Sequence, residues 1–239
     1  PILMYHHVKA RPIKELNVVT PKEFERQMSF IKKFGYKVLS FDEYMDIYEN
    51  GGNFPRNSLV ITFDDGYQNN YEFAFPILKK NAFAAVEFVV SDLIGKKNML
   101  TWDQIKEMDQ AGIIIGSHTR HHRYLPNIMD DELQNEIYGS KKILETGLGK
   151  EVKYFSYPTG GFSEEIKFLV KQAGYKASFT TNRGNDKTNK DLYELKRIHM
   201  NNHENWLSMF AKLSGYYNVF RRAKSPYSED DSLGAANLY

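Results

Sequence analysis

The 239-residue sequence contains no cysteine. This absence excludes disulfide bonds and thiolate metal sites, so any metal ion would be bound by histidine, aspartate or glutamate. No apolar run approaches the roughly 18 residues needed to cross a bilayer, and the most apolar stretch, residues 83–90, is interrupted by Glu87. Neither sign of charge dominates, because 32 basic residues stand against 30 acidic ones, for a net charge of +2. A nucleic acid is therefore not expected as the main partner.

Hydrophobic residues make up 41% of the chain and charged residues 26%, which is enough apolar material for a sizeable core. With about 150 residues per domain as a guide, the length allows one large domain or two small ones. We find no internal repeat and no interdomain linker, and we predict a single domain over residues 1–224. Residues 225–239 are polar and acidic without a regular period, and we predict a flexible tail there. Because the chain starts with Pro1 rather than methionine, we expect a targeting segment to precede it.

Short apolar runs rich in β-branched and aromatic residues alternate with helical patterns along the chain. The predicted strands are residues 2–5, 37–39, 59–63, 84–90, 113–116, 154–157, 177–181 and 195–200. Three helices are predicted to begin after Thr20, Ser40 and Thr101, each followed three positions later by Glu or Gln, and two more lie near residues 131–144 and 164–173. This alternation predicts an α/β fold with parallel strands and right-handed crossovers, either a doubly wound sheet or a (β/α) barrel.

Two adjacent aspartates, Asp64 and Asp65, follow the predicted strand 59–63 within the sequence TFDDGY. The plainest interpretation of Asp-Asp-Gly after a strand is a turn, since aspartate bonds its own backbone and glycine accepts a positive φ. In an extended chain the two carboxylates would point to opposite faces. Both can line one site only where the backbone turns, as Gly66 permits.

A histidine cluster follows another predicted strand, in the sequence GSHTRHH of residues 116–122. His118 and His122 are four positions apart, which would place both imidazoles on one side of a helical turn and within reach of one cation. The alternative is a solvated loop. Thr119 stands where a zincin motif carries its glutamate base, so a catalytic base would have to come from elsewhere.

The aspartate pair and the histidine cluster are expected to lie in one site. The carboxyl ends of parallel strands meet at one face, where ligands and catalytic groups assemble. One carboxylate and two imidazoles would make a three-ligand site for a borderline divalent ion, with open positions for water and substrate. The second carboxylate would then be free to act as a base.

Further strand ends carry candidate residues. The glycines of YPTGG, residues 157–161, would let backbone amides approach a developing oxyanion, the alternative being an ordinary Pro/Gly turn. His6 and His7 end the first strand, and alternation lets only one of them face the site as a general acid, unless both are surface or hydrogen-bonded histidines. Arg197 either holds a catalytic carboxylate in place or is a structural charge, whereas His199 and His203 are predicted to be structural.

TFDDGY, SHTRHH and YPTGG, in that order, resemble the polysaccharide deacetylases of carbohydrate esterase family four over residues 1 to about 200. The resemblance implies a single-domain distorted (β/α) barrel of seven to eight parallel strands. It also implies removal of N- or O-acetyl groups from sugars with a divalent metal ion, most commonly zinc, with cobalt or nickel as alternatives. By motif match Asp64 would be the general base, and the metal ligands would be Asp65, His118 and His122. Thr159 occupies the position whose backbone amide helps to form the oxyanion hole.

The sequence also departs from the commonest family pattern. The arginine expected shortly before the proline of the third motif is absent from residues 155–157, and the usual Asp-rich, Trp-bearing fourth motif is not visible in residues 180–186. The segments MYHHV and LKRI instead resemble the branch that acts on poly-N-acetylglucosamine, in which the first strand supplies the acid histidine. By this match His6 would be the acid and Arg197 the arginine that tethers the base.

Taken together, the residues and the resemblance predict a metal-dependent enzyme that hydrolyses the N-acetyl groups of an N-acetylglucosamine-containing polysaccharide or oligosaccharide and releases acetate. Three alternatives stay open: an O-acetyl esterase acting on acetylxylan, a hydrolase of a small cyclic or N-acyl amide, and a carbohydrate-binding barrel without turnover. A polymeric substrate further implies an extracellular or cell-surface protein.

Overall fold

The computed structural model describes residues 1–10, 17–183 and 189–214. At its centre is an eight-stranded sheet in which neighbouring strands are parallel. Its order is β10 (Ile198–His199), β1 (Ile2–Tyr5), β5 (Ser58–Phe63), β6 (Val86–Val89), β7 (Ile114–Ser117), β8 (Tyr154–Ser156) and β9 (Ala177–Phe179), and β4 (Lys37–Val38) pairs with the start of β5. A separate pair joins β2 (His7–Val8) and β3 (Val18–Val19). Each of the eight predicted strands coincides with one strand of the large sheet.

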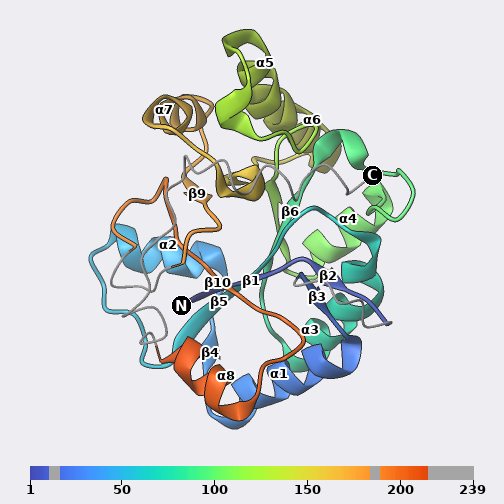
Figure 1. Ribbon diagram of the computed structural model, residues 1–239, viewed down its shortest axis with the longest axis vertical. Coiled ribbons are helices and arrows are strands. Elements are labelled where there is room, and N and C mark those ends of the chain that lie inside the picture. Colours follow the sequence, from blue (N-terminus) through green and yellow to red (C-terminus); the bar gives the residue numbers. More distant parts are fainter. Residues whose placement is uncertain (11–16, 184–188, 215–239) are drawn as a thin grey trace.

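The segment that leads into β10 connects the two ends of the sheet. Ile198 lies opposite Leu3 of β1, whereas Leu195, three residues earlier, forms a parallel bridge with Phe179 of β9. The curved sheet is thereby closed, with the helices lying around its outside (Figure 1). This is the single-domain distorted (β/α) barrel that the resemblance implied, and the doubly wound alternative is wrong. The predicted tail, residues 225–239, lies outside the described residues.

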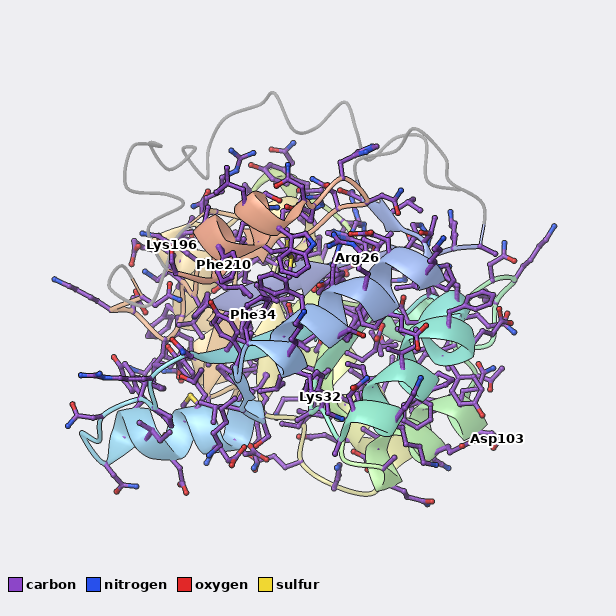
Figure 2. The ribbon with its side chains drawn as sticks, turned by 90° about the horizontal axis from the view of Figure 1, so that it is seen from below. Arg26, Lys32, Phe34, Asp103, Lys196 and Phe210 are labelled. Atoms are coloured by element: carbon purple, nitrogen blue, oxygen red, sulfur yellow. The ribbon has the colours of Figure 1, made fainter. Side chains whose placement is uncertain are left out.

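The helices occupy the crossovers between strands. They are α1 (Pro21–Lys33), α2 (Phe41–Glu49), α3 (Phe75–Asn81), α4 (Trp102–Gln110), α5 (Asp130–Gln134), α6 (Ser140–Leu148), α7 (Glu164–Gln172) and α8 (Trp206–Leu213). Short 3₁₀ turns form η2 (Ser91–Leu93), η3 (Leu125–Asn127) and η5 (Pro158–Gly160). Figure 2 shows Phe210 of α8 beside Phe34 at the end of α1, and their ring centroids are 4.8 Å apart. Within the described ranges, none of these helices combines the length and hydropathy required to cross a membrane.

The predicted helix starts are largely confirmed. The capping boxes at Ser40 and Thr101 are both present. At Thr20 the box is incomplete, because the Thr20 N–H donates to the Asn202 side chain and not to that of Glu23. The start of α1 is therefore tied to the loop that follows β10 on the sheet.

The single helix predicted near residues 131–144 is wrong in detail. Between α5 and α6 the chain makes a π-helical turn, η4 (Asn135–Gly139), and a second π-helical turn, η1 (Asn70–Ala74), precedes α3. A π turn holds one residue more than an α turn and often occurs at functional sites. Each of these turns carries a buried polar side chain, Asn70 on η1 and Glu136 on η4.

Buried side chains form one cluster on each face of the sheet, as alternation along the strands requires. The larger cluster packs Ile61 and other outward residues against the surrounding helices, and the smaller one contains Val60 and Phe179. Among the helices of the described ranges, α2 alone contributes to the smaller cluster, which therefore fills the inside of the barrel. Two residues further along β5 the inner face becomes polar at the buried Thr62, so polar side chains follow the apolar cluster toward the end of this strand.

Candidate active site

Asp64 directly follows β5 and is 1% exposed. Its two carboxylate oxygens accept hydrogen bonds from Nη1 and Nη2 of Arg197, at 2.7 and 2.6 Å. The guanidinium group also donates to the Thr62 hydroxyl at 3.1 Å, the Thr180 carbonyl at 3.1 Å and the Ser156 hydroxyl at 2.9 Å. A two-pronged arginine–carboxylate pair of this kind fixes both the position and the orientation of the carboxylate.

The surroundings of Asp64 keep its carboxylate ionised. Burial by itself raises the pKa of Asp64, but the charge and hydrogen bonds of Arg197, together with the electrostatic effects of His118 and His6, hold the pKa below its usual value. The Ser156 hydroxyl donates a further, longer hydrogen bond to Asp64, at 3.3 Å. An ionised carboxylate is only a hydrogen-bond acceptor, which is the state that a general base requires.

Asp65 turns the other way and faces the histidine cluster. Its Oδ1 atom lies 3.3 Å from Nε2 of His118 and 3.1 Å from Nε2 of His122. The backbone bends between the two aspartates, because Asp65 and Gly66 adopt left-handed conformations, with φ of 79° and 76°. This bend lets adjacent carboxylates lie in one site while only Asp65 contacts the imidazoles.

The donor atoms of Asp65, His118 and His122 all lie within 4.8 Å of one another. The His118 ring is oriented by a hydrogen bond on the side away from Asp65. Its Nδ1 is 2.8 Å from the Ser156 carbonyl, which can only accept a hydrogen bond. Nδ1 therefore donates to this carbonyl, and Nε2, which faces Asp65, is the ring nitrogen placed to bind a metal ion. Two imidazole nitrogens and one carboxylate oxygen that converge in this way suit a divalent ion such as zinc.

The helical turn predicted for His118 and His122 is wrong. Residues 118–122 form a loop, in which Thr119 and His122 adopt left-handed conformations with φ of 66° and 59°. The Thr119 hydroxyl accepts a hydrogen bond from the His122 N–H at 3.0 Å. Such conformations cost about 1–3 kcal/mol each in residues other than glycine, so surrounding contacts must hold this loop in shape.

The two histidines after β1 have different environments. Nδ1 of His6 is buried and has no hydrogen-bond partner among the described residues. His7 belongs to β2, where its Nδ1 lies 3.0 Å from the Asn69 side-chain nitrogen and its ring stacks on Tyr67 at 3.5 Å. Burial lowers the pKa of both, that of His7 to about 3. The structure therefore leaves His6 with a free ring nitrogen and gives His7 a structural contact.

The turn after β8 carries Thr159, in a left-handed conformation with φ of 53°. Glycine is required beside it, because a Cβ atom on Gly160 would lie 2.1 Å from the Thr181 hydroxyl, and one on Gly161 would lie 2.1 Å from the ring of Tyr124. The hydroxyl of Thr159 is buried without a hydrogen-bond partner among the described residues. The close packing thus gives YPTGG a defined shape rather than a loose turn.

Ser156 is a site residue that sequence reasoning missed. Its hydroxyl contacts Arg197 and Asp64, and its carbonyl orients His118, so this one residue touches the parts of the site that surround both aspartates. It belongs to residues 155–157, where the commonest family pattern has an arginine. That absence was the available signal, since the guanidinium beside Ser156 comes instead from Arg197, just before β10.

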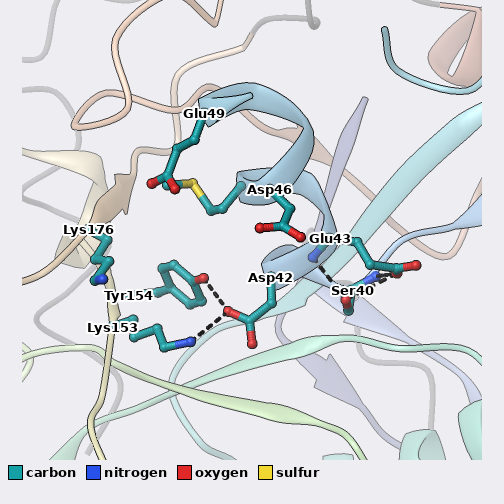
Figure 3. Close-up of a pocket in the computed structure, with 9 residues that line it drawn as sticks. Ser40, Asp42, Glu43, Asp46, Glu49, Lys153, Tyr154 and Lys176 are labelled. Atoms are coloured by element: carbon teal, nitrogen blue, oxygen red, sulfur yellow. Dashed lines mark hydrogen bonds and ion pairs between the residues drawn. The ribbon is translucent and has the colours of Figure 1, made fainter. Parts of the chain in front are cut away.

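His199 lies near His6, with ring centroids 5.9 Å apart, and its Nε2 contacts the Asn17 side-chain oxygen at 2.9 Å. The structural role of His199 stays a prediction. One described pocket, about 410 Å³ in volume, lies elsewhere, between α2 and the starts of β8 and β9 (Figure 3). It contains none of the predicted site residues, and its carboxylate Asp42 is engaged by Lys153 and Tyr154.

Comparison with known proteins agrees with this geometry. The family model for polysaccharide deacetylases matches residues 51–178. The Bacillus subtilis protein YxkH, named for polysaccharide deacetylase activity, is 35% identical over 83% of this chain and 70% of its own length. The poly-β-1,6-N-acetyl-D-glucosamine N-deacetylase of Staphylococcus aureus is 28% identical over 82% of this chain and 71% of its own length.

Solved structures show the same likeness. The Streptococcus pyogenes deacetylase PplD, in complex with acetate, superposes with a TM-score of 0.83 at 29% identity, covering 89% of this chain and 97% of that one. A polysaccharide deacetylase from Bacillus cereus gives a TM-score of 0.77 at 31% identity, covering 89% of this chain and 68% of that one. The chain belongs to the polysaccharide deacetylase family.

Proposed function

We propose that this polysaccharide deacetylase hydrolyses N-acetyl groups of a polymer of N-acetylglucosamine, in a metal-dependent reaction that releases acetate. The observation that carries the proposal is the pairing of a buried, arginine-bound carboxylate, Asp64, with the adjacent donor cluster of Asp65, His118 and His122. The choice of substrate is supported by the likeness to the Staphylococcus aureus enzyme, whose name specifies poly-β-1,6-N-acetyl-D-glucosamine. Because such a polymer lies outside the cell, we also propose an extracellular or cell-surface location for this protein.

The metal would be held by Oδ1 of Asp65 and by Nε2 of His118 and His122, and we propose zinc, with cobalt or nickel as replacements. When bound, a divalent ion supplies a Lewis acid that polarises the acetyl carbonyl and lowers the pKa of water. The chain prepares this site in advance. Burial raises the pKa of Asp65, but His122 and His118 more than reverse the effect, so Asp65 is ionised and ready to bind a cation.

Asp64 would accept the proton of the water molecule that attacks the acetyl carbonyl. Arg197 holds this carboxylate at two points, so its orientation is set before substrate arrives. The attack places a negative charge on the former carbonyl oxygen, and we assign the backbone amide of Thr159 as one donor to it. One such donor contributes about 2.7–4 kcal/mol of transition-state stabilisation in other hydrolases.

His6 would deliver a proton to the departing sugar amine, which is a poor leaving group without one. General acid catalysis of this kind contributes about 10²–10⁴ in rate. Burial lowers the pKa of His6, while the carboxylates of Asp65 and Asp64 act in the opposite direction. His6 is therefore expected to be neutral at rest. The proton that Asp64 takes from water would then reach the amine by way of His6, whose Nδ1 has no hydrogen-bond partner among the described residues.

The test measures metal content and acetate release on the same preparation. We expect one divalent ion per chain, loss of acetate release after chelation, and recovery on adding zinc. Among β-1,6-linked N-acetylglucosamine oligomers, acetylxylan and small N-acyl amides, the first should be the preferred substrate. If acetylxylan or a small amide were preferred, that compound class would become the proposed substrate. Full turnover by the metal-free protein would refute the metal dependence. Metal binding without acetate release from any of the three would support a binding barrel instead.

A further inference from the structure

Glu136 is a buried carboxylate that contacts the loop between the two histidine ligands. It lies on the π-helical turn η4 and is 2% exposed. Its Oε2 atom accepts hydrogen bonds from the backbone N–H groups of Arg120 and His121, both at 2.9 Å. Its Oε1 atom lies 2.6 Å from Nδ1 of His121. One carboxylate thus holds the middle of the segment that begins with His118 and ends with His122.

The same loop is held from its other side by Asp92 of η2. Arg120 donates to both carboxylate oxygens of Asp92, at 3.1 and 2.6 Å, and also to the side-chain oxygen of Asn135 at 2.7 Å. Gly139 makes room for this side chain, because a Cβ atom there would lie 2.8 Å from Cδ of Arg120. The π turn therefore supplies two polar side chains, Glu136 and Asn135, and the space beside Gly139, all directed at residues between the ligands.

These contacts stabilise a backbone that is unfavourable by itself. Thr119 and His122 flank the residues bound by Glu136, and both are left-handed. Without this acceptor, the N–H groups of Arg120 and His121 would lose hydrogen bonds that are partly shielded from solvent, and the loop would relax toward ordinary conformations. Such relaxation would move His122 relative to His118 and Asp65.

We propose that Glu136 is a positioning residue that sets the metal affinity of the site without touching the metal or the substrate. The inference rests on the proposed metal site. Residues that orient metal ligands in this indirect way typically change metal affinity by about 10–100-fold when they are removed. A carboxylate suits the role because it accepts from two backbone donors and an imidazole at once.

The experiment measures zinc affinity by competition with a chelating dye, using the wild-type chain, Glu136→Gln and Glu136→Ala. We expect affinity to fall about 10–100-fold in Glu136→Ala and less in Glu136→Gln, whose amide oxygen still accepts from the backbone. Glu132→Gln is the matched control, because Glu132 lies on the neighbouring helix α5 and its carboxylate pairs with the exposed Arg123 at 2.7 Å. Its zinc affinity should equal that of the wild type.

A role in folding alone would lower the melting temperature of the metal-free protein and leave the affinity of the folded fraction unchanged. Wild-type zinc affinity in folded Glu136→Ala would therefore overturn the inference. If Glu136→Ala does not fold, wild-type zinc affinity in Glu136→Gln would overturn it. The visible spectrum of the cobalt-loaded protein gives a second readout, which should differ between Glu136→Gln and Glu132→Gln. Failure of the wild type to bind zinc or cobalt would instead refute the proposed function.

Discussion

The guanidinium group of Arg197 binds both carboxylate oxygens of Asp64, a residue 133 positions earlier in the chain. Arg197 lies on the short segment that bridges β9 and β1, between Leu195 and Ile198. The segment that closes the barrel therefore also carries the residue that orients the proposed base. The pair is fully enclosed, with Arg197 0% exposed, so each charge depends on the other for compensation.

Arg197→Met should destabilise the fold strongly, because it leaves the Asp64 carboxylate buried without a partner. Breaking a buried pair in this way costs about 3–5 kcal/mol, and urea denaturation measures the loss. Adding Asp64→Asn to Arg197→Met should restore a large part of the stability. Arg123→Met removes an exposed pair with Glu132 and should change stability by about 0–1 kcal/mol. Equal effects of the two arginine substitutions would contradict the assignment.

Asp64→Asn should keep the metal and lose turnover. The amide preserves the shape of the side chain but cannot accept a proton from water, so acetate release should fall by at least about 10²-fold. Metal analysis of the same sample shows whether the neighbouring donor cluster is intact. A near-normal rate would remove Asp64 from the role of base.

Asp65→Ala and His118→Ala should each abolish both metal uptake and acetate release, because each removes one of three donors. Elemental analysis of the purified variants measures the first effect and an acetate assay the second. His203→Ala is a suitable control, since His203 lies outside the donor cluster and is exposed. Full occupancy in either ligand variant would be incompatible with the proposed site.

His6→Ala should give folded, metal-loaded protein whose rate is reduced by about 10²–10⁴. His7→Ala should act mainly on stability, because the His7 ring stacks on Tyr67 and its Nδ1 contacts Asn69. Comparing acetate release with melting temperature separates the two effects. The opposite pattern, with a catalytic loss only in His7→Ala, would reverse the assignment of the acid.

Glu87→Gln should stabilise the protein increasingly as pH rises. Glu87 is 0% exposed on β6, with one oxygen bonded by Asn70 at 3.1 Å and the other without a partner among the described residues. Burial, rather than Asp64 or Asp65, is the main reason that its pKa lies well above the usual 4.5.

The direction of this pH dependence follows from the different pKa of Glu87 in the folded and unfolded chains. Above pH 4.5 the unfolded chain releases the Glu87 proton while the folded chain keeps it, so the wild type loses stability with rising pH until the folded-state pKa is passed. Glutamine does not titrate and avoids this loss. Urea denaturation of metal-free protein between pH 4 and pH 9 measures the difference, and a gap that shrinks as pH rises would contradict the expectation.

Local signals in the sequence were sufficient for the elements and for most of the candidate site. Strand runs and capping residues such as Ser40 and Thr101 depend on neighbouring residues only, so they were readable without the fold. Asp64, Asp65, His118 and His122 could be brought together in advance, because parallel strands end at one edge of a sheet whatever the details of packing. The residue pattern by itself thus determined an α/β fold with a donor cluster at the strand ends.

Tertiary structure decided which atoms meet. The assignment of Asp64 to Arg197 and of Asp65 to the histidines depends on a left-handed turn and on barrel closure, neither of which has a local period. The same holds for the different contacts of His6 and His7, and for the π turn that brings Glu136 to the histidine loop. These contacts join residues far apart in sequence, and their geometry is set by the packing of the whole barrel rather than by the propensity of any segment.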